Sequence, residues 1–512
     1  MTMSSNPTHG YNTSVGYTFG FYREMAPGWL DLCVQAAGYE APRRDGSFRY
    51  LELGCGQGFG LCLLAAANSG SEFVGVDIQP DHIAHARQLA ESAGLTNVGF
   101  VEADFADLAE RWPDDLGTFD YVTLHGILTW VSPKLRQAAA DCVGHATHAG
   151  SLVYAGYNSQ PSWLGMVPFQ HFMKLFQKES GKPVNAAIED SVSLFERLRA
   201  GNAPGFQVLP VLDARLQTMR SHSASYLSHE YLNDYWQPLW HTEVADIFAQ
   251  AGLQFAGSAT ISDSLLPDAL SPQLRDLIAG QEDGGLRQDV QDFAINQGFR
   301  RDIFCRGELK PLRGGFPADD ARFVLVTQPE AGTELPVPTS YDRLSLPYRN
   351  VAPIVQALGN GPRSGEELAS VAGLVDKEFR RLIILLIQAG VVAVMADQPG
   401  NPDAANRLNA AIARAACDRG PYEQLAAAQI GSAIGASQIE LMLLDSWLEV
   451  SDRTDAKAVG DGVWDRMTRI GQKLYHQGQQ VDDAIARDQL QDVAAAFLRD
   501  NLPRWRQLGV VE

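Results

Sequence analysis

Four glycines stand at alternate positions in one short stretch of the sequence. The stretch reads YLELGCGQGFG, and it places Gly54, Gly56, Gly58 and Gly60 between two apolar runs. Glycine has no side chain, so a glycine-rich turn between a strand and a helix lets backbone amide groups approach a ligand closely. The spacing differs from the G-x-G-x-x-G pattern of proteins that bind a pyrophosphate. We therefore predict a nucleotide-like ligand that needs no diphosphate.

Two carboxylates follow the glycines, each at the end of an apolar run. Asp77 closes EFVGVD, and Asp104 follows VGFVEA. An acidic side chain at the end of the second strand of such a fold can accept hydrogen bonds from both ribose hydroxyls. Asp104 can accept one from an adenine amino group, and Phe105 can offer its backbone N–H and its ring. These residues predict a site for an adenosine that carries no phosphates.

Short apolar runs that alternate with amphipathic stretches must position these residues. We predict strands at RYLELG, EFVGVDI, VGFVEADF, FDYVTLHGI and SLVYAGYN, with helices between them. Strands that alternate with helices indicate a parallel sheet covered by helices on both faces. The predicted fold class is therefore α/β, with a doubly wound sheet over residues 47–158.

The segments LELGCGQG, GVD and EADF, in this order, resemble the cofactor site of class I S-adenosylmethionine-dependent methyltransferases. The resemblance implies a Rossmann-like domain, S-adenosyl-L-methionine as cofactor and no metal. It places Glu52 and the glycines around the methionine part, Asp77 at the ribose and Asp104 at the adenine. The cofactor-binding residues that we expect are Glu52, Gly54, Cys55, Gly56, Gly58, Asp77, Ile78, Asp104, Phe105 and His125.

A second resemblance lies downstream. LHGILTWVSPKLR (residues 124–136) and YLSHEYLNDYWQPLWHTEVADIFAQAGLQFAGSA (residues 226–259) are similar to segments of methyltransferases that carry a so-called regulatory domain. That group includes the rickettsial outer-membrane-protein lysine methyltransferases, so the resemblance implies a lysine acceptor on a protein. Ile127, Leu128, Thr129 and Ser132 differ from the pattern, and these differences leave the acceptor open.

Methyl transfer from a sulfonium is an in-line displacement, so the enzyme mainly has to orient the acceptor. A lysine acceptor must also lose its proton, because an ammonium group has no lone pair. We predict His125, at the end of the fourth strand, as an acceptor-pocket residue. Tyr17 and Tyr22, in GYTFGFYREMAP, are predicted to belong to a lid over the cofactor. These three are the catalytic candidates.

The pair His229 and Glu230 has the first two residues of the H-E-x-x-H zinc motif but lacks its second histidine. We therefore predict no metal site here. Buried hydrogen bonds from this pair would instead connect the middle of the chain to the catalytic domain.

The pattern along the chain divides it into five parts. We predict an N-terminal lid segment (1–46), the cofactor-binding core (47–158), a regulatory domain that could complete the core sheet (159–335), a winged-helix-like domain (336–398) and a mostly helical C-terminal domain (399–512). The prolines of residues 328–350 suggest a linker. The apolar run from Leu382 contains Gln388 and Gly390 and predicts a buried helix, a turn and a strand.

Composition and charge limit the classes of partner that the chain can bind. The 512 residues carry a net charge of −20, which repels nucleic acids and anionic membrane surfaces. The winged-helix-like part has few basic residues, so we expect it to contact proteins and not DNA. Six cysteines lack C-x-x-C spacing, and the polar N-terminus does not resemble a signal peptide. We expect a cytoplasmic protein with no membrane insertion and leave a homodimer open.

Two enzymatic functions fit the sequence. The preferred one is methylation of lysine side chains of a protein substrate, and the other is methylation of a small-molecule acceptor such as a sugar or a secondary metabolite. A third interpretation is a non-catalytic regulator that binds S-adenosylmethionine.

Overall fold

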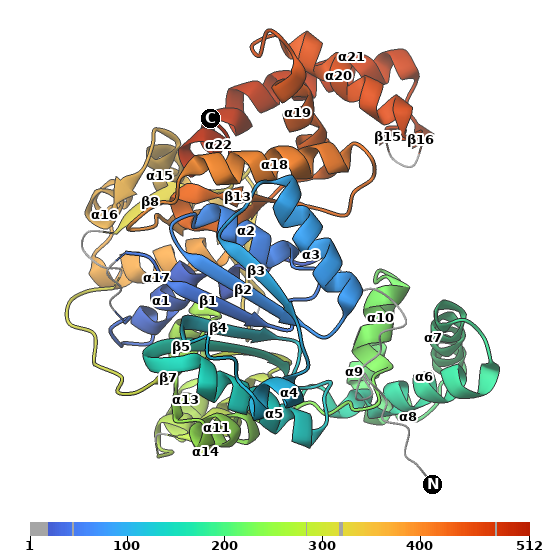
Figure 1. Cartoon of the computed structure of the whole chain (residues 1–512), viewed down its shortest axis with the longest axis vertical. Helices are drawn as coiled ribbons and strands as arrows, with labels where there is room; N and C mark the ends of the chain where they lie inside the picture. Colours follow the sequence, from blue (N-terminus) through green and yellow to red (C-terminus); the bar gives the residue numbers. More distant parts are fainter. Residues whose placement is uncertain (1–18, 43–45, 283, 317–320, 342, 477–478) are drawn as a thin grey trace.

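A seven-stranded sheet forms the centre of the computed structural model, which describes residues 19–42, 46–282, 284–316, 321–341, 343–476 and 479–512 (Figure 1). The strand order is β3-β2-β1-β4-β5-β7-β6. The first five strands are parallel, and β7 is antiparallel to both of its neighbours. The strands are β1 (Arg49–Leu53), β2 (Glu72–Asp77), β3 (Val98–Glu102), β4 (Phe119–His125), β5 (Thr147–Asn158), β6 (Leu253–Ser258) and β7 (Phe299–Arg306). The α/β fold class and the five predicted strands are confirmed, and two strands from the middle of the chain complete the sheet.

Helices cover both faces of the sheet because neighbouring strand residues point to opposite faces. In β1, Tyr50 packs into the core that contains α1 (Pro27–Ala36), α2 (Phe59–Ala67) and α3 (Pro80–Ser92). Leu51 and Leu53 pack into the core on the other face. That second core contains α4 (Phe105–Glu110), α5 (Pro133–Ala146) and α11 (His241–Gln250).

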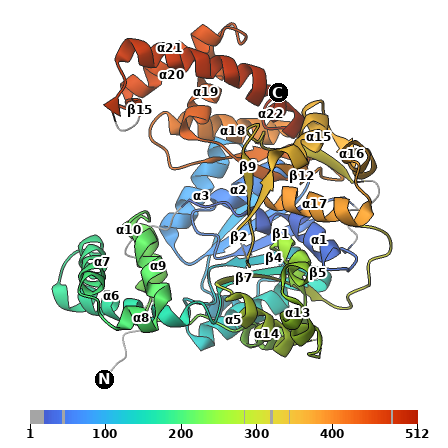
Figure 2. The same cartoon turned by 180° about the vertical axis from the view of Figure 1, so that it is seen from behind.

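Five helices after β5 form an arm beside the sheet (Figures 1 and 2). They are α6 (Val167–Ser180), α7 (Val184–Ala200), α8 (Gly205–Val208), α9 (Pro210–Met219) and α10 (Ala224–Tyr231). The arm has its own apolar core, which includes Phe169, Met173 and Phe195. Between β6 and β7 lie α12 (Leu266–Ala269), α13 (Pro272–Ala279) and α14 (Gly285–Ile295).

The winged-helix-like part consists of helices and a three-stranded sheet with the order β11-β8-β12. Its elements are β8 (Arg322–Leu325), α15 (Tyr348–Gly359), β11 (Arg363–Ser364), α16 (Gly365–Ala372), α17 (Asp376–Gln388) and β12 (Val392–Val394). The predicted helix, turn and strand from Leu382 are confirmed. The linker prediction is wrong in part, because β9 (Glu334–Pro338) and β10 (Arg343–Pro347) pair as a hairpin.

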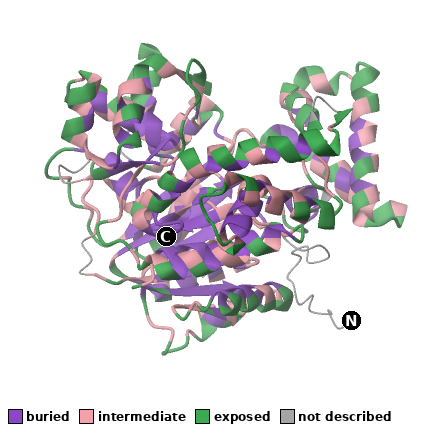
Figure 3. Cartoon of the chain, turned by 90° about the horizontal axis from the view of Figure 1, so that it is seen from above, coloured by how far each residue is buried: buried purple, intermediate pink, exposed green. Residues whose placement is uncertain are grey.

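The C-terminal part packs directly on the cofactor-binding core (Figure 1). Its elements are α18 (Pro402–Ala416), β13 (Gln424–Ala427), β14 (Ser432–Gly435), α19 (Gln438–Glu449), α20 (Ala456–Arg469), β15 (Tyr475–His476), β16 (Gln479–Gln480), α21 (Asp483–Ala496) and α22 (Leu502–Leu508). Helix α2 lies between the sheet on one side and α18, β13 and β14 on the other. This position explains why α2 is apolar all round, and Figure 3 shows buried residues across this central layer.

Two further observations concern the whole described part of the chain. None of its helices combines the length and the apolar character that crossing a membrane requires. The six cysteines are buried free thiols.

Candidate functional site

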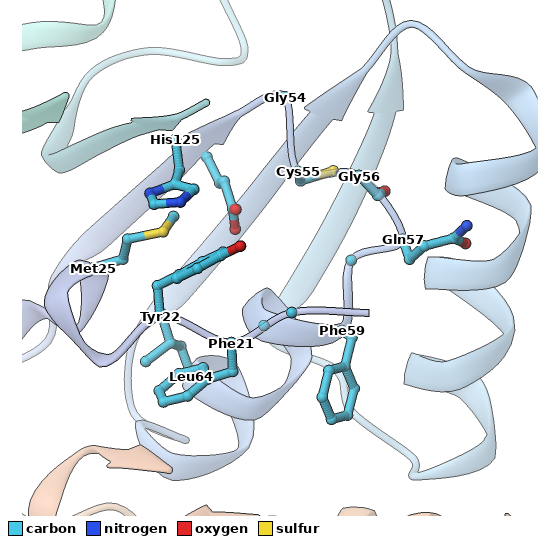
Figure 4. A pocket seen from close by; sticks show the side chains of 14 residues that line it. Phe21, Tyr22, Met25, Gly54, Cys55, Gly56, Gln57, Phe59, Leu64 and His125 are labelled. Carbon is cyan, nitrogen blue, oxygen red and sulfur yellow. Dashed lines mark hydrogen bonds between the residues drawn. The ribbon is translucent and has the colours of Figure 1, made fainter. Parts of the chain in front are cut away.

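A cavity opens where β1 and β4 end, beside the first turn of α2 (Figure 4). Its volume is about 570 Å³, counted with the space at its open mouth. It is lined by Gly20, Phe21, Tyr22, Met25, Glu52, Gly54, Cys55, Gly56, Gln57, Gly58, Phe59, Gly60, Leu64 and His125. The structure therefore brings together the glycines, Glu52, His125 and Tyr22, which the sequence places in three distant segments.

Close packing explains why the glycine loop (residues 54–58) tolerates no side chain at two positions. Gly54 has a φ of +78°, and a Cβ there would lie 2.4 Å from Cδ1 of Ile127. Gly58 has a φ of +69°, and its Cβ would lie 2.3 Å from the Cβ of Ala86. Only glycine combines this backbone conformation with this lack of space.

Asp77 connects the glycine loop to the end of β2. Its Oδ2 accepts a hydrogen bond from the backbone N–H of Gly56 at 2.9 Å, and its Oδ1 accepts one from the N–H of Gln79 at 2.9 Å. The Nδ1 atom of His82 lies 3.3 Å from Oδ1. Each carboxylate oxygen has two lone pairs, so Asp77 can hold the loop and still accept from a ligand hydroxyl.

Glu52 lies half-buried in the cavity wall. Burial and, to a lesser extent, the negative charge of Asp77 raise its pKa from 4.5 to about 8. The group is thus mainly protonated at neutral pH. A cation placed against it would favour the ionised form, so the cavity is suited to a positively charged ligand group.

His125 is a neutral imidazole in the same cavity. Burial and, to a lesser extent, the positive charge of Arg301 lower its pKa to about 3. Its Nδ1 lies 2.9 Å from the hydroxyl oxygen of Tyr154. The ring of Tyr22 is stacked on the imidazole, with centroids 3.8 Å apart (Figure 4). A neutral ring does not repel a cationic ligand group.

Arg23 holds the segment that carries Tyr22 in place. Its guanidinium donates hydrogen bonds to the backbone carbonyls of Ile387 and Gln388 at the end of α17. It also lies over the ring of Trp29, 4.5 Å from the centroid. The winged-helix-like part thereby contacts the residue next to the cavity wall.

Four of the predicted cofactor residues lie outside the cavity lining: Asp77, Ile78, Asp104 and Phe105. Asp104 caps α4, where its carboxylate accepts from the N–H of Ala106 at 2.7 Å. Phe105 begins α4, and its ring reaches to within 4.0 Å of the Cβ position of Gly54. Ile78 is half-buried directly after β2. Tyr17 lies outside the described residues.

Several lining residues were not among the predicted site residues. Phe21 belongs to the aromatic N-terminal segment, which the sequence indicated only as a lid. Met25, Phe59 and Leu64 gave no signal, because apolar residues in helices are ordinary core residues in a sequence.

Glu230 connects the arm to the core sheet. Its Oε1 accepts a hydrogen bond from Nδ2 of Asn158 at 3.0 Å, and burial raises the pKa of its carboxyl group. Within the described residues, no three His, Cys, Asp or Glu side chains come together as a metal site would require. Glu230 thus makes a buried hydrogen bond to the core sheet, as the sequence suggested for the pair His229 and Glu230.

Comparison with known proteins gives two family matches. Residues 45–150 match the model of a methyltransferase domain, and residues 223–306 match the model described as a predicted methyltransferase regulatory domain. An uncharacterized protein of Synechocystis sp. is 30% identical over 98% of this chain and 99% of its own length. A tRNA (guanine-N(7)-)-methyltransferase of Chloroflexus aurantiacus is 36% identical, but over only 19% of this chain and 38% of its own length.

A solved structure has the same overall fold. The structure of PKMT2 from Rickettsia typhi in complex with AdoHcy aligns with a TM-score of 0.72 and 17% identity, over 96% of this chain and 99% of that one. The two family models and the solved structure both indicate a methyltransferase fold, and the Synechocystis relative matches over the full length. The chain belongs to the class I S-adenosylmethionine-dependent methyltransferases that carry a methyltransferase regulatory domain.

Proposed function

We propose that the cavity between the glycine loop, Glu52 and His125 binds S-adenosyl-L-methionine, and that the enzyme methylates lysine side chains of a protein substrate. The observation that carries the proposal is the meeting of a glycine cradle, a carboxyl group with a raised pKa and a neutral imidazole in one cavity. The glycines leave the loop without side chains at these positions, so its backbone lines the cavity there.

Each residue has a role in this proposal. Glu52 faces the ammonium group of the methionine part, and the glycine loop with Cys55 surrounds that part. Asp77 and Ile78 lie at the ribose, and Asp104 and Phe105 lie at the adenine. When bound, the cofactor supplies an electrophilic methyl group on a sulfonium.

His125 and Tyr22 act on the acceptor side of the cavity. A pKa of about 3 means that the imidazole is neutral at neutral pH. His125 therefore directs the acceptor amine by hydrogen bonding and does not hold the proton that the amine loses. Tyr22 covers the imidazole and excludes water. Apolar walls favour the neutral amine over the ammonium form, and only the amine has the lone pair that attacks the methyl carbon.

The lysine acceptor is supported by the resemblance of residues 226–259 to the regulatory domain and by the net charge of −20, which attracts basic polypeptides. Mass spectrometry of proteins from a deletion strain and its parent strain tests it. We expect methylated lysines that disappear on deletion and return with the wild-type gene. Return with an Asp77→Ala gene would contradict the site, and an unchanged lysine pattern would contradict the acceptor.

A small-molecule acceptor is the second candidate. Ile127, one of the residues that differ from the lysine methyltransferase pattern, packs against Gly54 in the cavity wall. Loss of a methylated metabolite from the deletion strain, with protein lysines unchanged, would favour a sugar or secondary metabolite.

We further propose that the winged-helix-like part contacts proteins and not nucleic acid. Arg380 on α17 donates to the carbonyl of Ala36 and lies over the ring of Phe316, so it contacts the rest of the protein. We also propose a cytoplasmic location, and we leave open a homodimer formed through this part of the chain. Tight, steeply salt-dependent binding to random duplex DNA would contradict the proposal.

A further inference from the structure

The C-terminal part of the chain reaches the glycine loop through Tyr422, which lies between α18 and β13. The hydroxyl of Tyr422 lies 2.8 Å from Nε2 of His85 on α3. The Tyr422 ring is stacked on Phe59, with centroids 4.7 Å apart and planes inclined by 23°. Phe59 begins α2 and lines the cavity. Tyr422 is thus separated from the cavity only by the side chain of Phe59.

His85 also contacts the glycine loop directly. Its Nδ1 lies 2.7 Å from the backbone carbonyl oxygen of Gln57. A carbonyl can only accept, so Nδ1 donates to it, and in the tautomer with its proton on Nδ1 the Nε2 atom accepts from the Tyr422 hydroxyl. Tyr422, His85 and Gln57 therefore form a chain of two directed hydrogen bonds.

The peptide bond between Gln57 and Gly58 is held at both of its polar atoms. The N–H of Gly58 donates to the carbonyl of Cys55 at 3.0 Å, and the carbonyl of Gln57 accepts from His85. Gly56 and Gly58, on either side of Gln57, have φ values of +52° and +69°. Glycine-rich backbone is costly to order, so contacts that order it before binding strengthen binding.

The N-terminal segment rests on the same pair. The ring of Phe19 meets the His85 ring edge to face at 5.0 Å and the Tyr422 ring at 5.7 Å. Phe19 is followed by Gly20, Phe21 and Tyr22, which line the cavity. Both the loop and the lid of the cavity therefore have a support that comes from the C-terminal part.

We propose that Tyr422 is a positioning residue for cofactor binding that acts through His85 on the Gln57 carbonyl. The C-terminal part is then a component of the cofactor site and not an appended domain. This inference depends on the proposed location of the cofactor in the cavity beside the glycine loop.

Calorimetric titration with S-adenosylhomocysteine tests the inference in the full-length protein. We expect Tyr422→Phe, which keeps the stacked ring and removes one hydrogen bond, to raise the Kd about three- to tenfold. His85→Ala should raise it further. His85→Asn retains an N–H near the Gln57 carbonyl, so its Kd should lie between those of the wild type and His85→Ala. Tyr475→Phe, at an exposed tyrosine, should bind as the wild type does.

A double variant separates positioning from general loss of stability. Because Tyr422 acts through His85, the double variant Tyr422→Phe/His85→Ala should have the same Kd as His85→Ala alone. The melting temperature of each variant reports any folding defect separately. An unchanged Kd in Tyr422→Phe, or independent effects that multiply in the double variant, would overturn the inference.

Asp77→Asn distinguishes an error in the proposed role of Tyr422 from an error in the proposed location of the cofactor. If Asp77→Asn weakens binding and Tyr422→Phe does not, the site stands and the support by Tyr422 is wrong. If the wild type does not bind, or Asp77→Asn binds equally well, the proposed location of the cofactor is wrong and the inference falls with it.

Discussion

The ring of Tyr22 lies against the imidazole of His125, with centroids 3.8 Å apart and planes inclined by 26°. Tyr22 belongs to the segment before α1, whereas His125 ends β4 in the middle of the sheet. The contact closes the cavity on the side opposite the glycine loop (Figure 4). The lid and the sheet edge are thus joined by one pair of rings.

Removal of the Tyr22 ring should weaken cofactor binding. Tyr22→Ala removes a ring that lines the cavity, and an aromatic ring that contacts the bound cofactor contributes about 0.5 to 1.5 kcal/mol, so the Kd for S-adenosylhomocysteine should rise about two- to twelvefold. Tyr22→Phe keeps the ring and should bind much more like the wild type. Calorimetric titration measures both. Tighter binding by Tyr22→Ala would show that the ring occupies the ligand's place and does not cover it.

Asp77 should contribute strongly to binding, because it accepts from the N–H of Gly56 in the glycine loop and, in our proposal, from the ribose hydroxyls. Hydrogen bonds to a charged group contribute about 1.5 to 3 kcal/mol, so Asp77→Ala should raise the Kd about ten- to 150-fold. Asp81→Ala changes an exposed carboxylate at the start of α3 and is the matched control. Equal affinity of the Asp77 variant and the wild type would refute the role.

Glu52 should make S-adenosylmethionine binding depend on pH. In the free protein its pKa is about 8, so it is mostly protonated at neutral pH, and a bound ammonium group would ionise it. Binding should therefore release protons at neutral pH, and affinity should rise with pH until about 8 and then level off. Titration in buffers of different ionisation enthalpy measures the released protons. Glu52→Gln should abolish the release, and Glu91→Gln, at an exposed site, should retain it.

The same pKa predicts the stability of the ligand-free protein. A carboxyl group whose pKa is raised in the folded state contributes stability that is complete below the usual pKa of 4.5 and is lost as the pH rises through about 8. Glu52→Gln cannot ionise. Its melting temperature relative to the wild type should therefore increase between about pH 4.5 and about pH 8 and then level off. A constant difference would mean that Glu52 ionises freely.

Gly58→Ala should destabilise the protein and the cofactor site together. Its Cβ would lie 2.3 Å from that of Ala86, and its φ of +69° is unfavourable for alanine. Strain and overpacking together cost about 2 to 5 kcal/mol, which denaturant unfolding measures. Gly70→Ala is the control, since a Cβ there meets nothing within 4 Å. Equal stability of the two variants would contradict the packing.

The local parts of the site could be predicted from the sequence. Gly54 and Gly58 lie in the turn after β1 and Asp77 ends β2, so strand prediction alone places them at one edge of the sheet. Tyr422 could not be predicted, because its contact with His85 joins residues more than 300 positions apart and depends on how α18 packs on α2. The raised pKa of Glu52 likewise depends on burial by other segments.

The prolines of residues 328–350 explain the wrong linker prediction. Pro336, Pro338 and Pro347 lie within β9 and β10, which pair only with each other. Proline is tolerated in an edge strand, since the missing N–H can face away from the partner strand. A proline-rich composition therefore did not distinguish a two-stranded hairpin from an extended linker.

Calorimetric titration of the purified protein with S-adenosylmethionine and S-adenosylhomocysteine, beside NAD and with Asp77→Ala in parallel, tests the central claim most directly. We predict micromolar binding of the first two ligands to the wild type, no binding of NAD, and a large loss of affinity in Asp77→Ala. Binding of NAD, or equal binding by the wild type and the variant, would contradict the assignment of this cavity as the cofactor site.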